Sequence, residues 1–204
     1  MSFNSKNYWE NRYRSGGNSG EGSHGYLKEY KNEIINNFIK KNKIKSIIDF
    51  GCGDGNQIEN IDILNYYGYD VSNSTINRCK EMFKNTSKSN FNFYTINDSQ
   101  EFIKAELGLS LDVIYHLVED NVFHTYMKNL FDNSEKFVII YSNDYNADNV
   151  DPLTNKHYAP HVKPRNFTKY IETYFSKWFL IENIKNKYFG NNGVWSDFYI
   201  FQKL

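Results

Sequence analysis

Cysteine, proline and net charge are all scarce in this sequence. The 204 residues include only two cysteines, Cys52 and Cys79, which form neither a disulfide framework nor a metal-ligand pattern. The 24 basic and 24 acidic residues balance, so no basic field is present that would hold a nucleic acid. No apolar run is long enough to cross a bilayer, and the polar N-terminus lacks the apolar core of a signal peptide. We therefore expect a cytoplasmic protein, a monomer or homodimer, that takes a small-molecule substrate, binds no nucleic acid and does not insert into membranes.

The length suits one domain covering residues 1–204. Strand-like and helix-like segments alternate along most of the chain. Strands are predicted at 44–50, 65–71, 91–96, 136–142, 178–184 and 196–203, with another beginning near 107, and helices at 27–41, after Ser72 or Ser74, at 122–131 and at 166–175. This alternation predicts an α/β fold with a mostly parallel sheet.

Two segments fall outside this alternation. Residues 1–26 are loop-like, with aromatic anchors around a Gly/Ser-rich run, and we expect them to form a lid. Residues 143–165 hold all three prolines and two histidines, and we expect a substrate-side loop there because loops of this length are usually functional.

The stretch SIIDFGCGDGNQ, residues 46–57, places three glycines directly after a buried strand. Gly51, Gly53 and Gly55 permit backbone conformations that other residues avoid, and they let another group touch the backbone. Asp70 ends the next predicted strand, 70 − 49 = 21 residues after Asp49. An acid at that position is suited to accept hydrogen bonds from a ribose diol. The two features together predict a nucleoside site at the carboxyl edge of the sheet.

The loop departs from the G-x-G-x-x-G pattern of dinucleotide sites, because Asn56 stands where the third glycine belongs. Asp54 inside the loop would repel a pyrophosphate. It suits a ligand with a cationic amino-acid end, and the pattern fits S-adenosylmethionine. A dinucleotide-dependent oxidoreductase is disfavoured by the same glycine spacing.

The segments IIDFGCGDGNQ, GYDVS and SLDVIYHLVEDNVF resemble class I S-adenosylmethionine-dependent methyltransferases, over about residues 45–142. YWENRYRSGGNSGEGS and HVKPRNFTKYIE are similar to a small bacterial subset associated with surface-polysaccharide (capsule or O-antigen) gene clusters. The resemblance implies a doubly wound, seven-stranded, mostly parallel sheet with an antiparallel last strand. One difference is the short link after the glycine loop, which leaves little room for the usual first helix.

The resemblance also implies contacts to the methionyl part of the cofactor. Gly51, Gly53 and Gly55 would line it, and Asp49 or Asp54 would help to fix it.

For the rest of the cofactor, the resemblance implies that Asp70 holds the ribose hydroxyls and that Asp98, with Ser99 beside it, accepts from the adenine amino group. Asp112 would lie near the sulfonium, and His116 matches a histidine often found after the fourth strand. In the alternative interpretations, Asp98 caps a helix and His116 is a hydrogen-bonded core residue.

Methyl transfer from a sulfonium is an in-line displacement, and an alcohol acceptor benefits from a base. His116 and His161 are the candidate bases, with His157 as a further one, and Tyr115 and Tyr141 would line the substrate pocket.

Arginine is scarce, and three of the four arginines lie in the two segments outside the alternation. Because guanidinium groups bind phosphate and carboxylate, Arg12 or Arg165 would hold an anionic substrate. The alternative is surface charge. We expect O-methylation of a sugar, sugar phosphate or nucleotide sugar of a bacterial surface glycan. The competing hypothesis is a regulatory or assembly protein that binds the cofactor without methyl transfer.

Overall fold

A computed structural model describes residues 3–88, 90–97, 101–146, 157–190 and 194–204 of the chain. The helices are α1 (Ser5–Arg14), α2 (Gly25–Asn42), α3 (Asn73–Phe83), α4 (Asp120–Asp132) and α5 (Phe167–Tyr174), with short 3₁₀ turns η1 (Glu21–Ser23) and η2 (Ile114–His116). The strands are β1 (Ser46–Phe50), β2 (Asn65–Asp70), β3 (Phe91–Thr95), β4 (Ala105–Leu111), β5 (Ser134–Ser142), β6 (Trp178–Ile184) and β7 (Asp197–Lys203).

The seven strands form one sheet in the order β3-β2-β1-β4-β5-β7-β6. The first five strands along the chain are parallel, and β7 is antiparallel to both β5 and β6. The predicted seven-stranded, doubly wound α/β fold with an antiparallel last strand is therefore confirmed. The strand order reverses between β1 and β4, and ligands of such sheets bind outside the carboxyl ends of the strands at this point.

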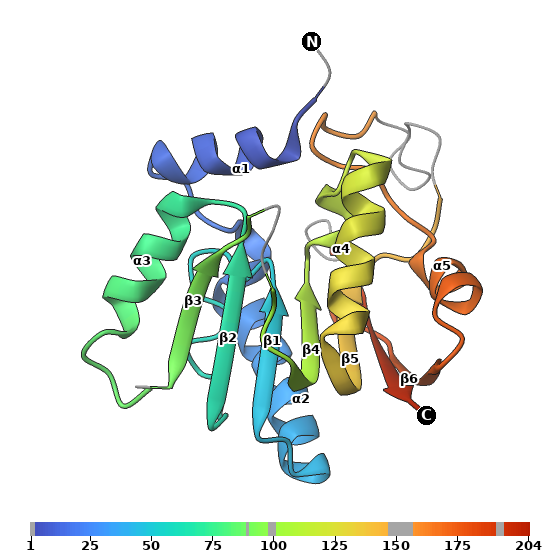
Figure 1. Ribbon diagram of the computed structural model, residues 1–204. Coiled ribbons are helices and arrows are strands. Elements are labelled where there is room, and N and C mark those ends of the chain that lie inside the picture. Colours follow the sequence, from blue (N-terminus) through green and yellow to red (C-terminus); the bar gives the residue numbers. More distant parts are fainter. Residues whose placement is uncertain (1–2, 89, 98–100, 147–156, 191–193) are drawn as a thin grey trace.

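Helices cover both faces of the sheet. Apolar residues of α2 and α3 form one buried cluster with one face of the strands, and residues of α4 and α5 form a second cluster with the other face. In Figure 1, α2 lies behind the sheet and α4 lies in front of it. Strands covered on both faces read as continuous apolar runs, which is why β1 and β5 are recognisable in the sequence.

Residues 51–64, all of which the structure describes, form turns and no helix between β1 and β2. The link is thus too short for the usual first helix, as its length predicts. Of the two candidate caps for the next helix, Ser72 is the N-cap of α3, and its side chain accepts a hydrogen bond from the backbone N–H of Thr75.

The loop-like prediction for residues 1–26 is wrong at Ser5–Arg14, because these ten residues form helix α1. Its apolar residues are too few to show a helical period, and Asn4 caps its N-terminus by accepting from the backbone N–H of Asn7. Figure 1 shows α1 lying across the carboxyl ends of the strands. No helix in the described part of the chain is long and apolar enough to span a membrane.

Candidate functional site

A cavity of about 270 Å³ lies at the carboxyl edge of the sheet. Its wall includes residues that directly follow β1, β2 and β4, and α1 contributes Trp9 and Tyr13. The predicted site residues that line it are Asp49, Gly51, Gly53, Asp70, Asp112 and His116. Those that lie outside its wall are Arg12, Asp54, Gly55, Tyr115, Tyr141, His161 and Arg165. Asp98 and Ser99 lie outside the described residues.

The glycine loop adopts the left-handed backbone conformation at Gly51, Gly53 and Gly55, with φ of 84°, 57° and 79°. At Gly53 an added Cβ would lie 2.3 Å from Ser19 Oγ, so a side chain there would displace the N-terminal segment. At Gly55 the space is filled by Phe83, 2.9 Å from an added Cβ. Two of the three glycines therefore shape the cavity, and the third lets the loop pack on α3.

Asp70 ends β2 and joins it to the glycine loop. Its Oδ2 accepts from the backbone N–H of Gly53 at 3.1 Å, and its Oδ1 accepts from that of Ser72 at 2.9 Å. Burial raises the pKa of Asp70 to about 6, although these backbone hydrogen bonds act to lower it. A carboxylate has about four acceptor positions, so Asp70 is able to accept a further hydrogen bond from a ligand in the cavity.

Asp49 is buried beneath the same loop, with 2% of its surface exposed. Tyr66 donates its hydroxyl hydrogen to Asp49 Oδ2 at 2.6 Å, whereas Oδ1 is buried with no hydrogen-bond partner among the described residues. Burial raises the pKa of Asp49 to about 7, and the hydrogen bond from Tyr66 opposes this rise. A buried carboxylate oxygen without a partner is costly, so this geometry favours a ligand that donates to Oδ1.

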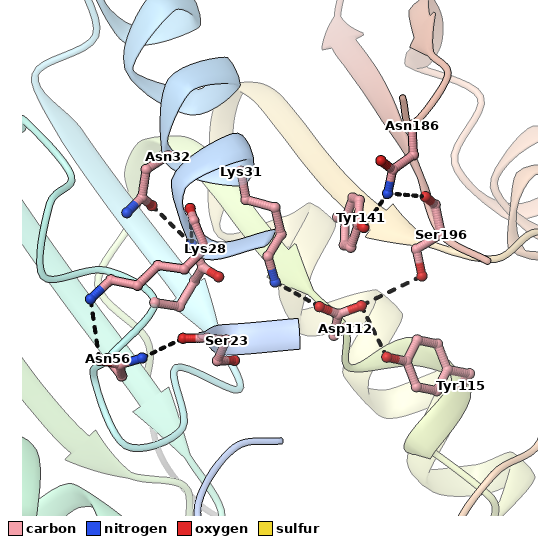
Figure 2. A network of polar contacts seen from close by, with 11 residues as sticks. Ser23, Lys28, Lys31, Asn32, Asn56, Asp112, Tyr115, Tyr141, Asn186 and Ser196 are labelled. Carbon is pink, nitrogen blue, oxygen red and sulfur yellow. Dashed lines mark hydrogen bonds and ion pairs between the residues drawn. The ribbon is translucent and has the colours of Figure 1, made fainter. Parts of the chain in front are cut away.

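Asp112 follows β4 in the left-handed conformation, with φ of 59°, and forms an ion pair that the sequence did not predict. Lys31 of α2 is completely buried, and its Nζ donates to Asp112 Oδ2 at 2.7 Å. Tyr115 donates to Asp112 Oδ1 at 2.9 Å, and the Lys31 ammonium lies 5.0 Å from the centre of the Tyr141 ring. Figure 2 shows this network around Asp112. The two tyrosines thus support Asp112 and Lys31 from behind the cavity wall.

His116 is held by a backbone contact. Its Nδ1 lies 2.8 Å from the carbonyl oxygen of His161. Because a carbonyl only accepts, Nδ1 bears the hydrogen and the lone pair of the neutral ring is on Nε2. Burial lowers the pKa of His116 to about 4. No hydrogen bond of Nε2 is found among the described residues, so this nitrogen is able to take a proton.

Aromatic rings surround His116. Trp9 packs edge-on against it with ring centres 4.9 Å apart, and His161 stacks on it at 5.4 Å. Tyr8 in turn stacks on His161 at 4.6 Å. Arg12 lies over Trp9 at 5.7 Å, and its charge contributes to lowering the pKa of both histidines. The ring of His161 therefore serves this cluster, while its carbonyl orients His116.

Arg165 forms hydrogen bonds and an ion pair within the protein. Its Nη2 donates to the carbonyl oxygens of Leu117 at 2.6 Å and Val118 at 3.0 Å, and its Nη1 pairs with Asp120. The guanidinium also lies 4.7 Å from the ring centre of Phe123. These contacts tie the segment before α5 to the segment before α4, so Arg165 has a structural role in this geometry.

Two carboxylates fasten α1 over the cavity. At its start, the backbone N–H of Ser5 donates to Glu119 Oε1 at 2.8 Å, and the Ser5 hydroxyl contacts the same carboxylate. Further along, Glu10 accepts from the hydroxyls of Ser72 at 2.7 Å and Ser74 at 2.6 Å. These hydrogen bonds lower the pKa of Glu10. The helix thus bridges the N-termini of α3 and α4.

Asp54 fastens the segment after α1. Its Oδ2 accepts from the backbone N–H of Ser19 at 3.0 Å, and the Ser19 hydroxyl accepts from the backbone N–H of Asp54 at 3.0 Å. The Tyr13 hydroxyl lies 3.0 Å from the same Ser19 oxygen. The acid inside the glycine loop is therefore occupied by the N-terminal segment.

Several residues in or near the cavity wall were not predicted as site residues from the sequence, among them Trp9, Glu10, Lys31 and Gln57. The sequence does indicate that Lys31 is unusual, because this charged residue lies four positions after Leu27 and therefore on the apolar face of α2. For Gln57 the sequence gives no indication beyond its proximity to the glycine loop. Among the described residues, no group of three or more His, Cys, Asp or Glu is arranged to hold a metal ion.

A scan against protein-family models finds no match for this sequence, and a search of curated proteins finds none either. Solved structures do match. Magnesium protoporphyrin IX methyltransferase (ChlM) from Synechocystis PCC 6803 with bound SAH superposes with a TM-score of 0.69 at 12% identity, covering 98% of both chains. The N-methyltransferase NodS from Bradyrhizobium japonicum WM9 in complex with S-adenosylhomocysteine gives a TM-score of 0.70 at 13% identity, covering 98% of this chain and 99% of the other.

The small RNA methyltransferase HEN1 gives a TM-score of 0.63 at 18% identity, covering 90% of this chain and 26% of the other. At these low identities the similarity shows the fold, and the acceptors of these enzymes differ from one another. The chain has the Rossmann-like fold of class I S-adenosylmethionine-dependent methyltransferases.

Proposed function

We propose that the chain is an S-adenosylmethionine-dependent methyltransferase that binds its methyl donor in the cavity at the carboxyl edge of the sheet. The observation that supports this most directly is the buried Asp49 oxygen that has no partner beside the glycine loop among the described residues. An amino-acid ammonium supplies the missing donor. Asp70, 21 residues further on and with lone pairs to spare, accepts from the ribose hydroxyls. The residues present therefore fit this cofactor.

The bound cofactor supplies an electrophilic methyl group on a sulfonium. The protein then has to orient the acceptor, exclude water and accept a proton. Trp9 and the rest of α1 close the cavity from above. His116, unprotonated at neutral pH and held through Nδ1, takes the proton of an acceptor hydroxyl on Nε2. This arrangement supports O-methylation.

We assign the acceptor to small, anionic sugar derivatives, such as a sugar phosphate or nucleotide sugar of a bacterial surface glycan. Arg12 supports this assignment, because its positive charge lies close enough to His116 and His161 to lower their pKa values. Both Nη groups of Arg165 bind within the protein, whereas the hydrogen bond of Arg12 is from its Nε to the carbonyl oxygen of Asn18, at 2.8 Å. Arg12 is therefore the residue that we propose for the anion. Residues 1–26 then act as a lid on a single domain.

The test is transfer of an isotopically labelled methyl group to a panel of sugars, sugar phosphates, nucleotide sugars, amines and a short RNA duplex. We expect His116→Asn to lower kcat by about 100-fold or more, while the affinity for S-adenosylhomocysteine measured by calorimetry is unchanged. His124→Asn is the matched control, because His124 lies on the exposed side of α4 and outside the cavity wall.

Absence of S-adenosylhomocysteine binding by the wild-type protein would refute the proposal as a whole. Binding without turnover on any acceptor would favour the regulatory alternative. Full turnover by His116→Asn would remove the histidine from the mechanism, and transfer to amines alone would replace O-methylation with N-methylation.

A further inference from the structure

Gln57 is a buried polar residue in the wall of the cavity, with 6% of its surface exposed. Its Nε2 donates to Asn32 Oδ1 at 2.9 Å and lies 3.4 Å from the carbonyl oxygen of Lys28. Because the carbonyl of Lys28 only accepts, the amide nitrogen of Gln57 has to face α2. The orientation of this amide is therefore set by α2, and the amide oxygen is turned away from that helix.

The amide oxygen of Gln57 lacks a partner in the described part of the chain. Gln57 Oε1 is buried without a hydrogen bond among these residues, as is Asp49 Oδ1. Both residues line the same cavity as Gly51 and Gly53. A buried acceptor without a donor costs about 1–3 kcal/mol, so two of them in one cavity point to a ligand group rich in donors. Both orphaned atoms are acceptors, and an ammonium, with three N–H groups and a positive charge, meets this requirement.

We propose that Gln57 binds the α-ammonium of the methyl donor together with Asp49, and that Asn32 is the residue that positions it. The proposal rests on the proposed function, because it assumes that the donor is S-adenosylmethionine. A glutamine suits this place better than a glutamate. It accepts a hydrogen bond without adding a third negative charge beside Asp49 and Asp70, both of which already have raised pKa values through burial.

The test uses calorimetry with two ligands, S-adenosylhomocysteine and its analogue lacking the α-amino group. Gln57→Met keeps the length of the side chain and removes its oxygen. We expect this variant to bind S-adenosylhomocysteine about 10- to 100-fold more weakly than the wild type, as for loss of a hydrogen bond to a charged group. For the analogue, which has no ammonium, we expect a change within about twofold, because the lost contact is absent there.

Gln202→Met is the control, since Gln202 is exposed on β7, and it should bind both ligands as the wild type does. Gln57→Asn withdraws the amide by one methylene and should show a smaller loss that is again confined to S-adenosylhomocysteine. This second variant tests the proposal if Gln57→Met proves unfolded in a thermal melt.

Equal losses for both ligands would show a structural role for Gln57 and overturn the inference, as would no loss for either. These results are distinct from failure of the proposed function. In that case the wild-type protein itself would not bind S-adenosylhomocysteine.

Discussion

Replacing Asp49 with asparagine removes a carboxyl group that the fold buries at the end of β1. In the ligand-free protein burial raises the pKa of Asp49 to about 7, whereas its ordinary value is 3.8. Between these values the folded protein holds a proton that the unfolded chain has lost. The free energy of unfolding therefore falls as the pH rises through this range, since stability falls wherever the native state binds more protons. The amide that replaces the carboxyl group does not titrate, so the stability of the Asp49→Asn variant should not show this decrease with rising pH.

The size of the effect follows from the two pKa values. At about pH 5 the buried carboxyl group costs on the order of 2 kcal/mol, and at about pH 8 on the order of 4 kcal/mol. The free energy of unfolding of Asp49→Asn should therefore rise relative to that of the wild type by about 2–3 kcal/mol between these pH values. Any constant difference in packing or in the hydrogen bond to Tyr66 cancels, because only the change with pH is compared. Asp49 is 2% exposed, so solvent screening does not reduce the effect appreciably.

The assay is urea unfolding of the ligand-free proteins at both pH values, followed by tryptophan fluorescence. Asp62→Asn, which removes an exposed carboxyl group, controls for the change in net charge. The same Asp49→Asn variant should lose affinity for S-adenosylhomocysteine, so that it is more stable and less able to bind. A stability difference that is equal at both pH values, or that shrinks at the higher one, would refute the reasoning.

Three further predictions concern the contacts around the cavity. Gly53→Ala should lower the free energy of unfolding more than Gly25→Ala does. Both glycines have positive φ, which costs about 1–2 kcal/mol for alanine, but only at Gly53 does the added Cβ meet another residue, Ser19 Oγ at 2.3 Å. Equal losses in urea unfolding would contradict this. Glu10→Gln should speed protease cleavage within the N-terminal segment and leave global unfolding nearly unchanged, because it weakens the charged contact that fastens α1 to α3; an unchanged cleavage rate would show that this contact does not hold α1. Arg165→Ala should lower stability by about 2–3 kcal/mol through lost hydrogen bonds, whereas a rise in the acceptor KM without loss of stability would assign Arg165 to the substrate.

The parts of this protein that are readable from its sequence are those whose signals are local. The apolar runs of β1 and β5, the positions of the glycines and the interval between Asp49 and Asp70 all depend on neighbouring residues or on one strand–turn–strand unit. The missing helix after the glycine loop follows from the length of the link alone. For these reasons the fold and the edge of the sheet at which the cavity lies are predictable without coordinates.

Other features depend on residues that are far apart in the sequence. The partner of Asp112 is Lys31, 81 positions away, and the group that orients His116 is the carbonyl of His161, 45 positions away. Arg165 looked available for a substrate because nothing near it in the sequence shows that the carbonyls of Leu117 and Val118, 48 and 47 positions away, accept from it.

The sequence by itself thus determined the α/β architecture, the edge of the sheet at which the cavity lies and the acid that ends β2, since periodicity and spacing are properties of the chain. Only the tertiary structure decided that α1 is a helix closing the cavity, that Asp54 is occupied by Ser19, and that Asp49 and Gln57 keep oxygens unpaired among the described residues beside the glycine loop. The physical reason is that burial and hydrogen-bond partnership are set by what packs against a residue. For this site, the packing comes from the N-terminal segment and from α2, both of which precede β1 and its glycine loop in the sequence.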